Sequence, residues 1–215
     1  VGRILDTLEK NNLTDNTLIV LTSDNGGANY IHLSDINKPY RGWKLTHFEG
    51  GLHVPFMAKW PNKIKPGIEF NAPIHANDIL PTFAAAAGAE LPDDRIIDGV
   101  NLLPFLQNHN SEMPHETLYW LQGRLQTVLH ENWKLITDHR TGKDWLFNVE
   151  SDPYERINLA SEMTLKVEEL KRLLNDHKKV QPPPLYDNTM SVPILIDKHN
   201  GYAFQDGDEF TYWDN

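Results

Sequence analysis

The first residues that could do chemistry follow an apolar run, where Asp24-Asn25 precedes two glycines. A carboxylate beside an amide carbonyl supplies the hard oxygen ligands that Ca²⁺ prefers, and the glycines let the backbone turn sharply around a bound ion. The same residue types also end strands in simple turns, and the dipeptide alone favours that structural interpretation. Two ligands cannot fill a calcium shell of about six to eight oxygens, so any metal here takes most of its ligands from other segments.

A second candidate is the basic segment 38–65, which carries six Lys or Arg against one acidic residue. On an acidic chain, such a patch favours a site for one anionic group over general affinity for polyanions. Lys44 could neutralise an anionic ester and stabilise the charge that develops on its leaving oxygen. A solvated loop is the alternative, and for Lys44 the spacing favours neither interpretation. Lys59, Lys63 and Lys65 fit ordinary surface positions.

Two histidines, His47 and His53, lie inside the basic segment and are candidates for contact with an anion or a substrate. Packing and surface positions are the alternatives for both. A zinc-binding His-Glu-x-x-His motif is absent from the sequence, because neither His115 nor His130 has a second His four residues on.

Composition excludes several classes of function. The 215 residues contain no Cys, which rules out a disulfide scaffold, a thiolate metal site and a cysteine nucleophile among them. The net charge of −10 makes nucleic acid an unexpected partner. No apolar run approaches the roughly 18 residues that a membrane span needs. The oligomeric state cannot be derived from these features.

The elements that must position the candidates mix strands and helices up to about residue 115. Residues 17–22 are continuously apolar, which favours a strand covered on both faces, as in a parallel sheet. Asp24-Asn25 would then lie at the carboxyl edge, where open α/β sheets bind ligands. A second strand is predicted at 54–60, and a helix is predicted from Asn77 or Asp78 to Gly88.

The pattern changes after residue 116. Four short strand-type segments separated by turn residues predict an antiparallel sheet: 117–122, 125–130, 133–138 and 144–149. A helix with apolar Met163, Val167, Leu170 and Leu174 is expected to pack on this sheet. Three prolines at 182–184 end the helix and begin an extended acidic tail.

Five stretches, taken in order, resemble the type I sulfatases, the formylglycine-dependent sulfuric ester hydrolases of the alkaline phosphatase superfamily. They are Asp15-Asn16-Thr17 leading into Ser23-Asp24-Asn25-Gly26-Gly27, Arg41-Gly42-Trp43-Lys44 with Glu49-Gly50-Gly51 and Val54-Pro55, Asp78-Ile79-Leu80-Pro81-Thr82, Asp98-Gly99-Val100-Asn101-Leu102, and Leu146-Phe147-Asn148-Val149 with Asp152-Pro153-Tyr154-Glu155 and Asn158-Leu159-Ala160.

The resemblance implies an α/β fold, the C-terminal part of an alkaline-phosphatase-like α/β/α sandwich followed by a small antiparallel sheet subdomain with one packed helix. Its domains would be 1–115, the C-terminal part of the catalytic domain; 116–180, the small subdomain; and 181–215, the extended acidic tail. It also implies that Asp24 and Asn25 are two calcium ligands and that Lys44 is a catalytic residue contacting the sulfate group.

His47 and His53 depart from the family's usual residues, a small hydroxyl residue and an Arg, and both are kept as substrate-binding candidates. A sulfated small molecule or carbohydrate is the expected substrate. The periplasm or the extracellular space is the expected location, by family habit.

The nucleophile of such enzymes comes from a Cys/Ser-x-Pro-x-Arg motif, which this sequence lacks. Ser151-Asp152-Pro153-Tyr154-Glu155 ends in Glu where Arg is required. The helical spacing of Val1, Ile4, Leu5 and Leu8 also begins at the first residue without an N-cap. We therefore expect the C-terminal half of a sulfatase, inactive alone, whose nucleophile and other ligands lie in an N-terminal half.

Two other interpretations remain. One is a phosphatase or phosphonate monoester hydrolase of the same superfamily, and the other is a non-catalytic carbohydrate-binding pseudoenzyme.

Overall fold

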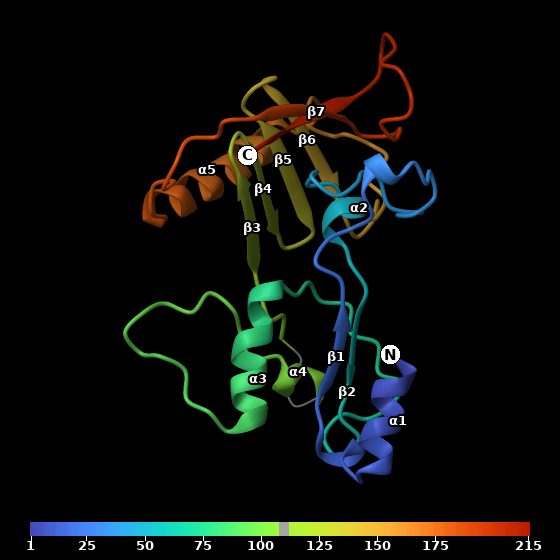
Figure 1. Ribbon diagram of the computed structural model, residues 1–215. Coiled ribbons are helices and arrows are strands. Elements are labelled where there is room, and N and C mark those ends of the chain that lie inside the picture. Colours follow the sequence, from blue (N-terminus) through green and yellow to red (C-terminus); the bar gives the residue numbers. More distant parts are fainter. Residues whose placement is uncertain (108–111) are drawn as a thin grey trace. The chain divides into compact units, whose positions relative to one another are not determined.

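The computed structural model describes residues 1–107 and 112–215, which form two compact units (Figure 1). The first unit combines Val1–Thr22 with Pro55–Glu116, and the second combines Ser23–Val54 with Thr117–Asn215. All five candidate site residues, Asp24, Asn25, Lys44, His47 and His53, therefore belong to the second unit.

The first unit is built on two paired strands, β1 (Ile19–Thr22) and β2 (Phe56–Lys59). Its helices are α1 (Gly2–Lys10), α3 (Ile79–Ala87) and α4 (Leu103–Leu106). A small core of Trp60, Ile64 and Leu103, with Ala58 and Ala86 packed against it, joins β2, α3 and α4. The two expected strands and the helix from Asp78 to Gly88 are thus confirmed, with Gly88 ending α3 in the left-handed conformation.

The expectation of parallel pairing for the first strand is wrong. β1 pairs with β2 antiparallel, with Ile19 opposite Lys59 and Thr22 opposite Phe56. Neither is the strand covered on both faces, because the Leu21 side chain is 41% exposed. A continuous apolar run predicts that a strand is buried, but it does not predict whether the neighbouring strand runs parallel or antiparallel to it.

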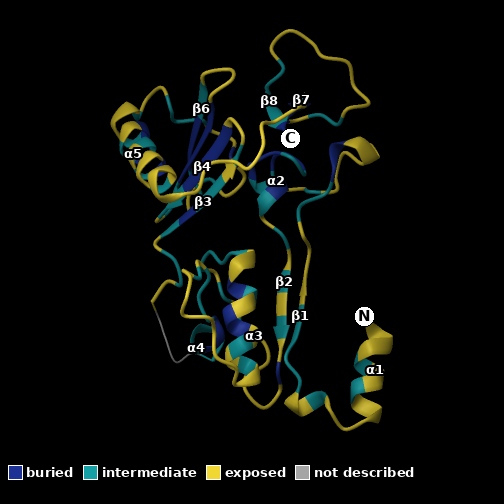
Figure 2. Ribbon diagram, turned by 60° about the vertical axis from the view of Figure 1, so that its left-hand side comes forward, coloured by how far each residue is buried: buried dark blue, intermediate teal, exposed yellow. Residues whose placement is uncertain are grey.

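The second unit contains the expected antiparallel sheet. Its strands are β3 (Thr117–Gln122), β4 (Leu125–His130), β5 (Trp133–Asp138) and β6 (Lys143–Asn148), paired in sequence order. Helix α5 (Thr164–Val180) packs on this sheet through the apolar positions predicted for it (Figures 1 and 2). Those positions meet Val128 of β4, Leu135 of β5 and Leu146 of β6.

The opposite face of the same sheet is also covered. Ile136 and Trp145 of the sheet form a second core with Phe48 and Ile196, which lie far away in the sequence. Because side chains alternate along a strand, Leu135 and Ile136 point to opposite faces and anchor the two cores. The segment that carries Lys44 is thereby packed against the sheet.

The C-terminal residues are more ordered than an extended tail. β7 (Ser191–Leu195) and β8 (Phe210–Asp214) pair antiparallel, and Ile194, Leu195 and Ile196 are buried. In the described part of the chain, no helix combines the length and apolar character needed to cross a membrane.

Candidate active site

The backbone after β1 is hydrogen bonded directly to the segment that runs from Lys44 into the short helix α2 (Glu49–Leu52). The Gly26 N–H donates to the Gly51 carbonyl oxygen at 3.0 Å, and the Lys44 N–H donates to the Gly27 carbonyl oxygen at 3.0 Å. No side chain separates the two segments at these points. Asp24-Asn25 and Lys44, which lie about 20 positions apart in the sequence, are therefore carried by adjoining backbone segments.

Glycine is required where these segments touch. A Cβ added to Gly26 would lie 1.8 Å from the Gly50 carbonyl oxygen, and one added to Gly51 would lie 2.3 Å from the Thr46 carbonyl oxygen. Both distances are far shorter than van der Waals contact. The glycines thus permit close backbone approach. From the sequence, the glycines after Asp24-Asn25 were expected only to let the backbone turn around a ligand.

The side chain of Asn37 also links these two backbone segments through hydrogen bonds. Its amide oxygen accepts from the Gly27 N–H at 2.6 Å, and its amide nitrogen donates to the carbonyl oxygens of Gly27 and Gly42 at 2.9 and 3.0 Å. One side chain therefore satisfies three backbone groups on two segments. The sequence analysis missed this residue, because an Asn between Ile36 and Lys38 carries no motif signal.

A strained turn presents Lys44. Trp43 and Thr46 close the turn, with the Thr46 N–H donating to the Trp43 carbonyl oxygen at 3.0 Å. Between them, Leu45 has a φ of +77°, a left-handed conformation that costs a leucine roughly 1–2 kcal/mol. Such strain persists only where the surroundings enforce it, and it is concentrated at functional sites. Lys44 itself is half-buried.

The ammonium group of Lys44 has no hydrogen bond or ion pair among the described residues. Lysines that serve only to stabilise the surface either extend into water or pair with a carboxylate, as Lys38 does with Asp35 at 2.6 Å. A half-buried, unpaired cation on a fixed turn is suited to an anionic ligand.

Asp24 and Asn25 meet part of what a calcium ion needs. Asp24 is exposed, and the amide nitrogen of Asn25 donates to the Gly26 carbonyl oxygen at 2.9 Å, which leaves the amide oxygen to accept or coordinate. The donor types fit Ca²⁺, whereas their number does not complete its shell. Among the described residues, no group of three or more His, Cys, Asp or Glu could hold a metal ion.

His47 lies inside the second unit. It is 5% exposed and its Nδ1 is hydrogen bonded to Thr127 Oγ1 at 2.9 Å. Burial and the nearby charge of Lys134 lower its pKa to about 3, so the imidazole is neutral at physiological pH. This placement favours support of the loop over direct contact with a substrate.

His53 is half-exposed and is oriented by two neighbours. Its Nδ1 lies 2.8 Å from Glu49 Oε2, and its ring stacks on Tyr40 with centroids 4.4 Å apart. Tyr40 in turn meets the exposed Tyr154 edge to face at 5.8 Å. Of the two histidines, His53 is therefore the one that a substrate could reach.

Beneath these residues lies a buried ion cluster that the sequence analysis missed. Lys134 of β5 is 1% exposed, and its ammonium lies between Glu49 Oε1 at 2.5 Å and Glu155 Oε1 at 2.8 Å. The Glu155 carboxylate also accepts from the Glu49 N–H at 2.6 Å. The cluster ties the segment after Lys44 to the sheet.

The pKa values in this cluster are strongly shifted. Burial would raise the pKa of Glu49, but Lys134 and His53 outweigh it and lower the pKa to about 2. Burial, with repulsion from Glu49, keeps the pKa of Glu155 above its ordinary value. Burial disfavours the charge of Lys134, yet the two carboxylates raise its pKa.

Comparison with known proteins points to one family. The profile described as Sulfatase matches residues 1–89. Over 160 residues the chain is 39% identical to the steryl-sulfatase of Rattus norvegicus, covering 71% of this chain and 27% of that protein. Over 240 residues it is 30% identical to the ulvan-active sulfatase of Formosa agariphila, covering 93% of this chain and 44% of that protein.

Solved structures agree with these relatives. The chain superposes on Ps i-CgsB with a TM-score of 0.74 at 29% identity, covering 86% of this chain and 41% of that one. The chain belongs to the sulfatase family. The resemblance to type I sulfatases and the alkaline-phosphatase-like fold class are thereby confirmed. This chain spans less than half the length of each of these three proteins.

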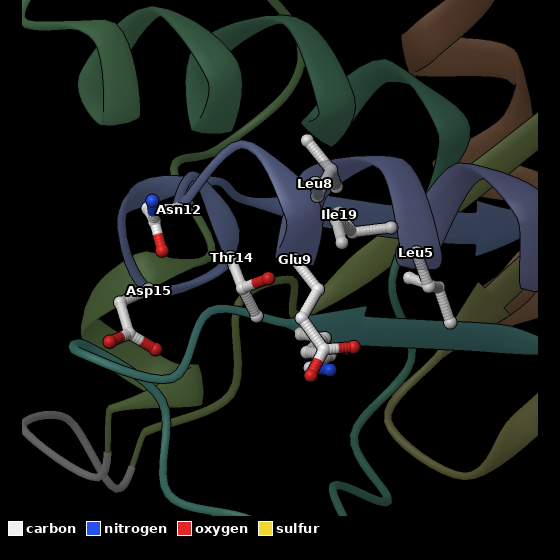
Figure 3. A pocket seen from close by; sticks show the side chains of 8 residues that line it. Leu5, Leu8, Glu9, Asn12, Thr14, Asp15 and Ile19 are labelled. Atoms are coloured by element: carbon white, nitrogen blue, oxygen red, sulfur yellow. The ribbon is translucent and has the colours of Figure 1, made fainter.

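A separate cavity of about 440 Å³ lies in the first unit of this sulfatase chain. Leu5, Leu8 and Glu9 of α1 line it together with Ile19 of β1 (Figure 3). No residue of α1 is buried in the described structure. The cavity contains none of the candidate site residues.

Proposed function

We propose that this chain supplies one side of the active site of a sulfuric ester hydrolase. The observation that carries the proposal is the unpaired ammonium of Lys44, a half-buried residue on a strained turn that is hydrogen bonded to the segment of Asp24 and Asn25. Membership of the sulfatase family supports the reaction class.

Each residue then has a distinct task. Lys44 donates a hydrogen bond to the sulfate group and stabilises the negative charge that grows on the leaving oxygen as the ester bond breaks. Asp24 and Asn25 supply two oxygen ligands to calcium. Bound calcium supplies positive charge that draws electrons from the sulfate group.

His53 contacts the alcohol portion of the ester, because its ring is half-exposed and oriented by Glu49. His47 holds the loop from inside through Thr127. The two histidines, treated alike from the sequence, therefore have different roles in this proposal.

The nucleophile comes from outside these 215 residues. They contain no Cys and no Cys/Ser-x-Pro-x-Arg motif, so a formylglycine and the remaining calcium ligands are assigned to an N-terminal half of the same protein. The isolated chain is therefore inactive in this proposal. A Cys/Ser-x-Pro-x-Arg motif in the coding sequence upstream of Val1 would support the enzyme, and its absence would favour a pseudoenzyme.

A sulfated carbohydrate is the proposed substrate class, and the periplasm or the extracellular space is the proposed location. The ulvan-active sulfatase aligns with 93% of this chain, and the structure of BT4656, 27% identical with a TM-score of 0.58, holds D-glucosamine-2-N,6-O-disulfate. Steryl-sulfatases are also relatives, so small sulfated molecules form the second class to assay.

A phosphonate monoester hydrolase from Silicibacter pomeroyi shares the fold with a TM-score of 0.64, but at 20% identity. That likeness concerns the fold alone. Assays of the full-length protein with matched sulfate, phosphate and phosphonate esters separate these reactions directly.

Substitution of Lys44 tests the catalytic assignment. In the full-length protein, Lys44→Ala should lower kcat by about 100- to 1000-fold, the effect of removing one donor to a developing oxyanion. The control is Lys63→Ala, which removes an exposed cation of the same basic segment. Near-normal turnover by the Lys44 variant would remove this residue from the mechanism.

A further inference from the structure

Arg41 begins the loop that ends in the Lys44 turn, and its side chain is 8% exposed. Its guanidinium binds Asp197 through two parallel hydrogen bonds, from Nε and from an Nη nitrogen, each 2.7 Å long. The same Nη nitrogen also donates to Glu209. Bidentate pairing fixes the plane of an arginine as well as its position.

Both carboxylates come from the C-terminal segment. Asp197 follows β7, and Glu209 precedes β8. Glu209 is also paired with Lys143 and accepts from the indole Nε1 of Trp145 at 3.3 Å. Burial would raise the pKa of Glu209, but hydrogen bonds from Lys143 and Arg41 lower it to about 2.

The C-terminal segment is itself anchored to the sheet. Ile196, next to Asp197, is fully buried in the core that contains Phe48 and Trp145. Thr211 of β8 donates to Asp138 Oδ2 at 3.2 Å. One of these contacts lies directly after β7 and the other lies within β8, so Asp197 and Glu209 are held on a rigid support.

The backbone of Arg41 transmits this restraint to the site. Its carbonyl oxygen accepts from the Gly50 N–H at 2.6 Å, and its guanidinium lies 5.1 Å from the centroid of the Phe48 ring. Arg41 is thus fixed at its side chain and at its backbone, three residues before Lys44.

We propose that Asp197 and Glu209 are positioning residues that hold Arg41 and thereby fix the loop from which Lys44 reaches the sulfate group. The C-terminal segment, expected from the sequence as a surface tail, is then part of the support of the active site. The catalytic consequence rests on the proposed function, whereas the restraint on the loop does not.

Hydrogen exchange on the 215-residue chain tests the restraint without any turnover. The double variant Asp197→Asn/Glu209→Gln removes both charges and keeps the side-chain shapes. The Lys44 and Gly50 amides should then exchange about 10- to 100-fold faster, as expected when a charged hydrogen-bond network is weakened, while amides of β4 and β5 keep their rates. The control Asp187→Asn/Asp206→Asn makes the same change of charge at exposed positions.

Kinetics of the full-length protein test the consequence. The double variant should lower kcat at least about tenfold with little change in KM, and Asp197→Glu, which keeps a carboxylate, should restore part of the loss. Unchanged exchange of the Lys44 and Gly50 amides overturns the inference, as does faster exchange throughout the sheet, which would indicate global destabilisation. Faster loop exchange in a protein that hydrolyses no sulfate ester would support the restraint and reject the proposed function.

Discussion

At the scale of single residues, the buried charge of Lys134 neutralises the carboxylates of Glu49 and Glu155 beside it. The side chain is 1% exposed and lies between two carboxylates, one from Glu49 at the start of α2 and one from Glu155 in the loop after β6. A buried ion pair contributes little net stability compared with an apolar group, but removal of one partner leaves the others uncompensated. Lys134 therefore determines whether Glu49 and Glu155 can remain in place.

We expect Lys134→Met to destabilise the second unit by about 3–5 kcal/mol, because two buried carboxylates lose their counter-ion. Urea unfolding followed by tryptophan fluorescence measures this change, since every tryptophan except Trp60 lies in the second unit.

Two controls make the Lys134 result specific. Lys63→Met replaces an exposed lysine and should leave the unfolding free energy within about 0.5 kcal/mol of the original. The triple variant Lys134→Met/Glu49→Gln/Glu155→Gln removes all three charges and should recover part of the loss. A triple variant no more stable than Lys134→Met would contradict the electrostatic explanation.

At the scale of elements, the site depends on segments that touch without side chains between them. Gly26→Ala would place a Cβ 1.8 Å from the Gly50 carbonyl oxygen, so the two segments must separate. We expect a loss of about 1–3 kcal/mol or more in the free energy of unfolding, together with faster exchange of the Lys44 amide. Urea unfolding and hydrogen exchange measure the two effects.

Gly2→Ala is the matched control for Gly26. A Cβ on Gly2, in α1, would meet no atom within 4 Å, and alanine favours a helix over glycine. This variant should be neutral or slightly stabilising. Equal stability of the two alanine variants would show that the segments are not in backbone contact.

The elements that could be predicted from the sequence are those specified by nearby residues. The antiparallel sheet of 117–148 and helix α5 follow from alternation, turn residues and helical spacing, all of which act over a few positions. The direction of β1 relative to β2 and the packing of 191–214 depend on partners distant in the sequence. Local patterns do not record those partners.

The same limit applies to the site. Asp24, Asn25 and Lys44 stand in motifs, so calcium binding and catalysis could be predicted for them, and these roles stay predictions. Asn37 and Lys134 act through segments that approach only in the folded chain. One signal was available for Lys134, because a charged residue between the apolar residues Trp133 and Leu135 in a predicted strand indicates a buried partner.

At the scale of the whole molecule, the buried ionisable groups make the second unit sensitive to acid. His47 has a pKa of about 3 in the folded chain, lowered by burial and by Lys134, against 6.5 as its ordinary value. The His47 imidazole therefore binds a proton below about pH 6.5 in the unfolded chain, but only below about pH 3 in the folded chain. Stability falls as the pH decreases through this window, at up to about 1.4 kcal/mol per pH unit.

Glu49 and Glu209 extend the same trend to lower pH. Both have a pKa lowered to about 2 from 4.5, so the stability that they contribute above pH 4.5 is lost as the pH falls toward 2. Glu155 acts in the opposite sense, because its pKa is raised. The slope of the free energy of unfolding against pH therefore contains contributions from several groups, so a variant is needed to isolate the contribution of His47.

His47→Gln isolates the part that titrates between pH 6.5 and 4.5. Glutamine can keep a hydrogen bond to Thr127 but binds no proton. Between pH 7 and pH 5, His47 lowers the free energy of unfolding by about 2 kcal/mol, and the variant should not show this decrease. Urea unfolding at half-unit pH steps measures both slopes. The control His32→Gln makes the same substitution at an exposed histidine. If His47→Gln and the original chain lose stability equally above pH 4.5, the imidazole is protonated in the folded state and the neutral, loop-supporting role given to it is wrong.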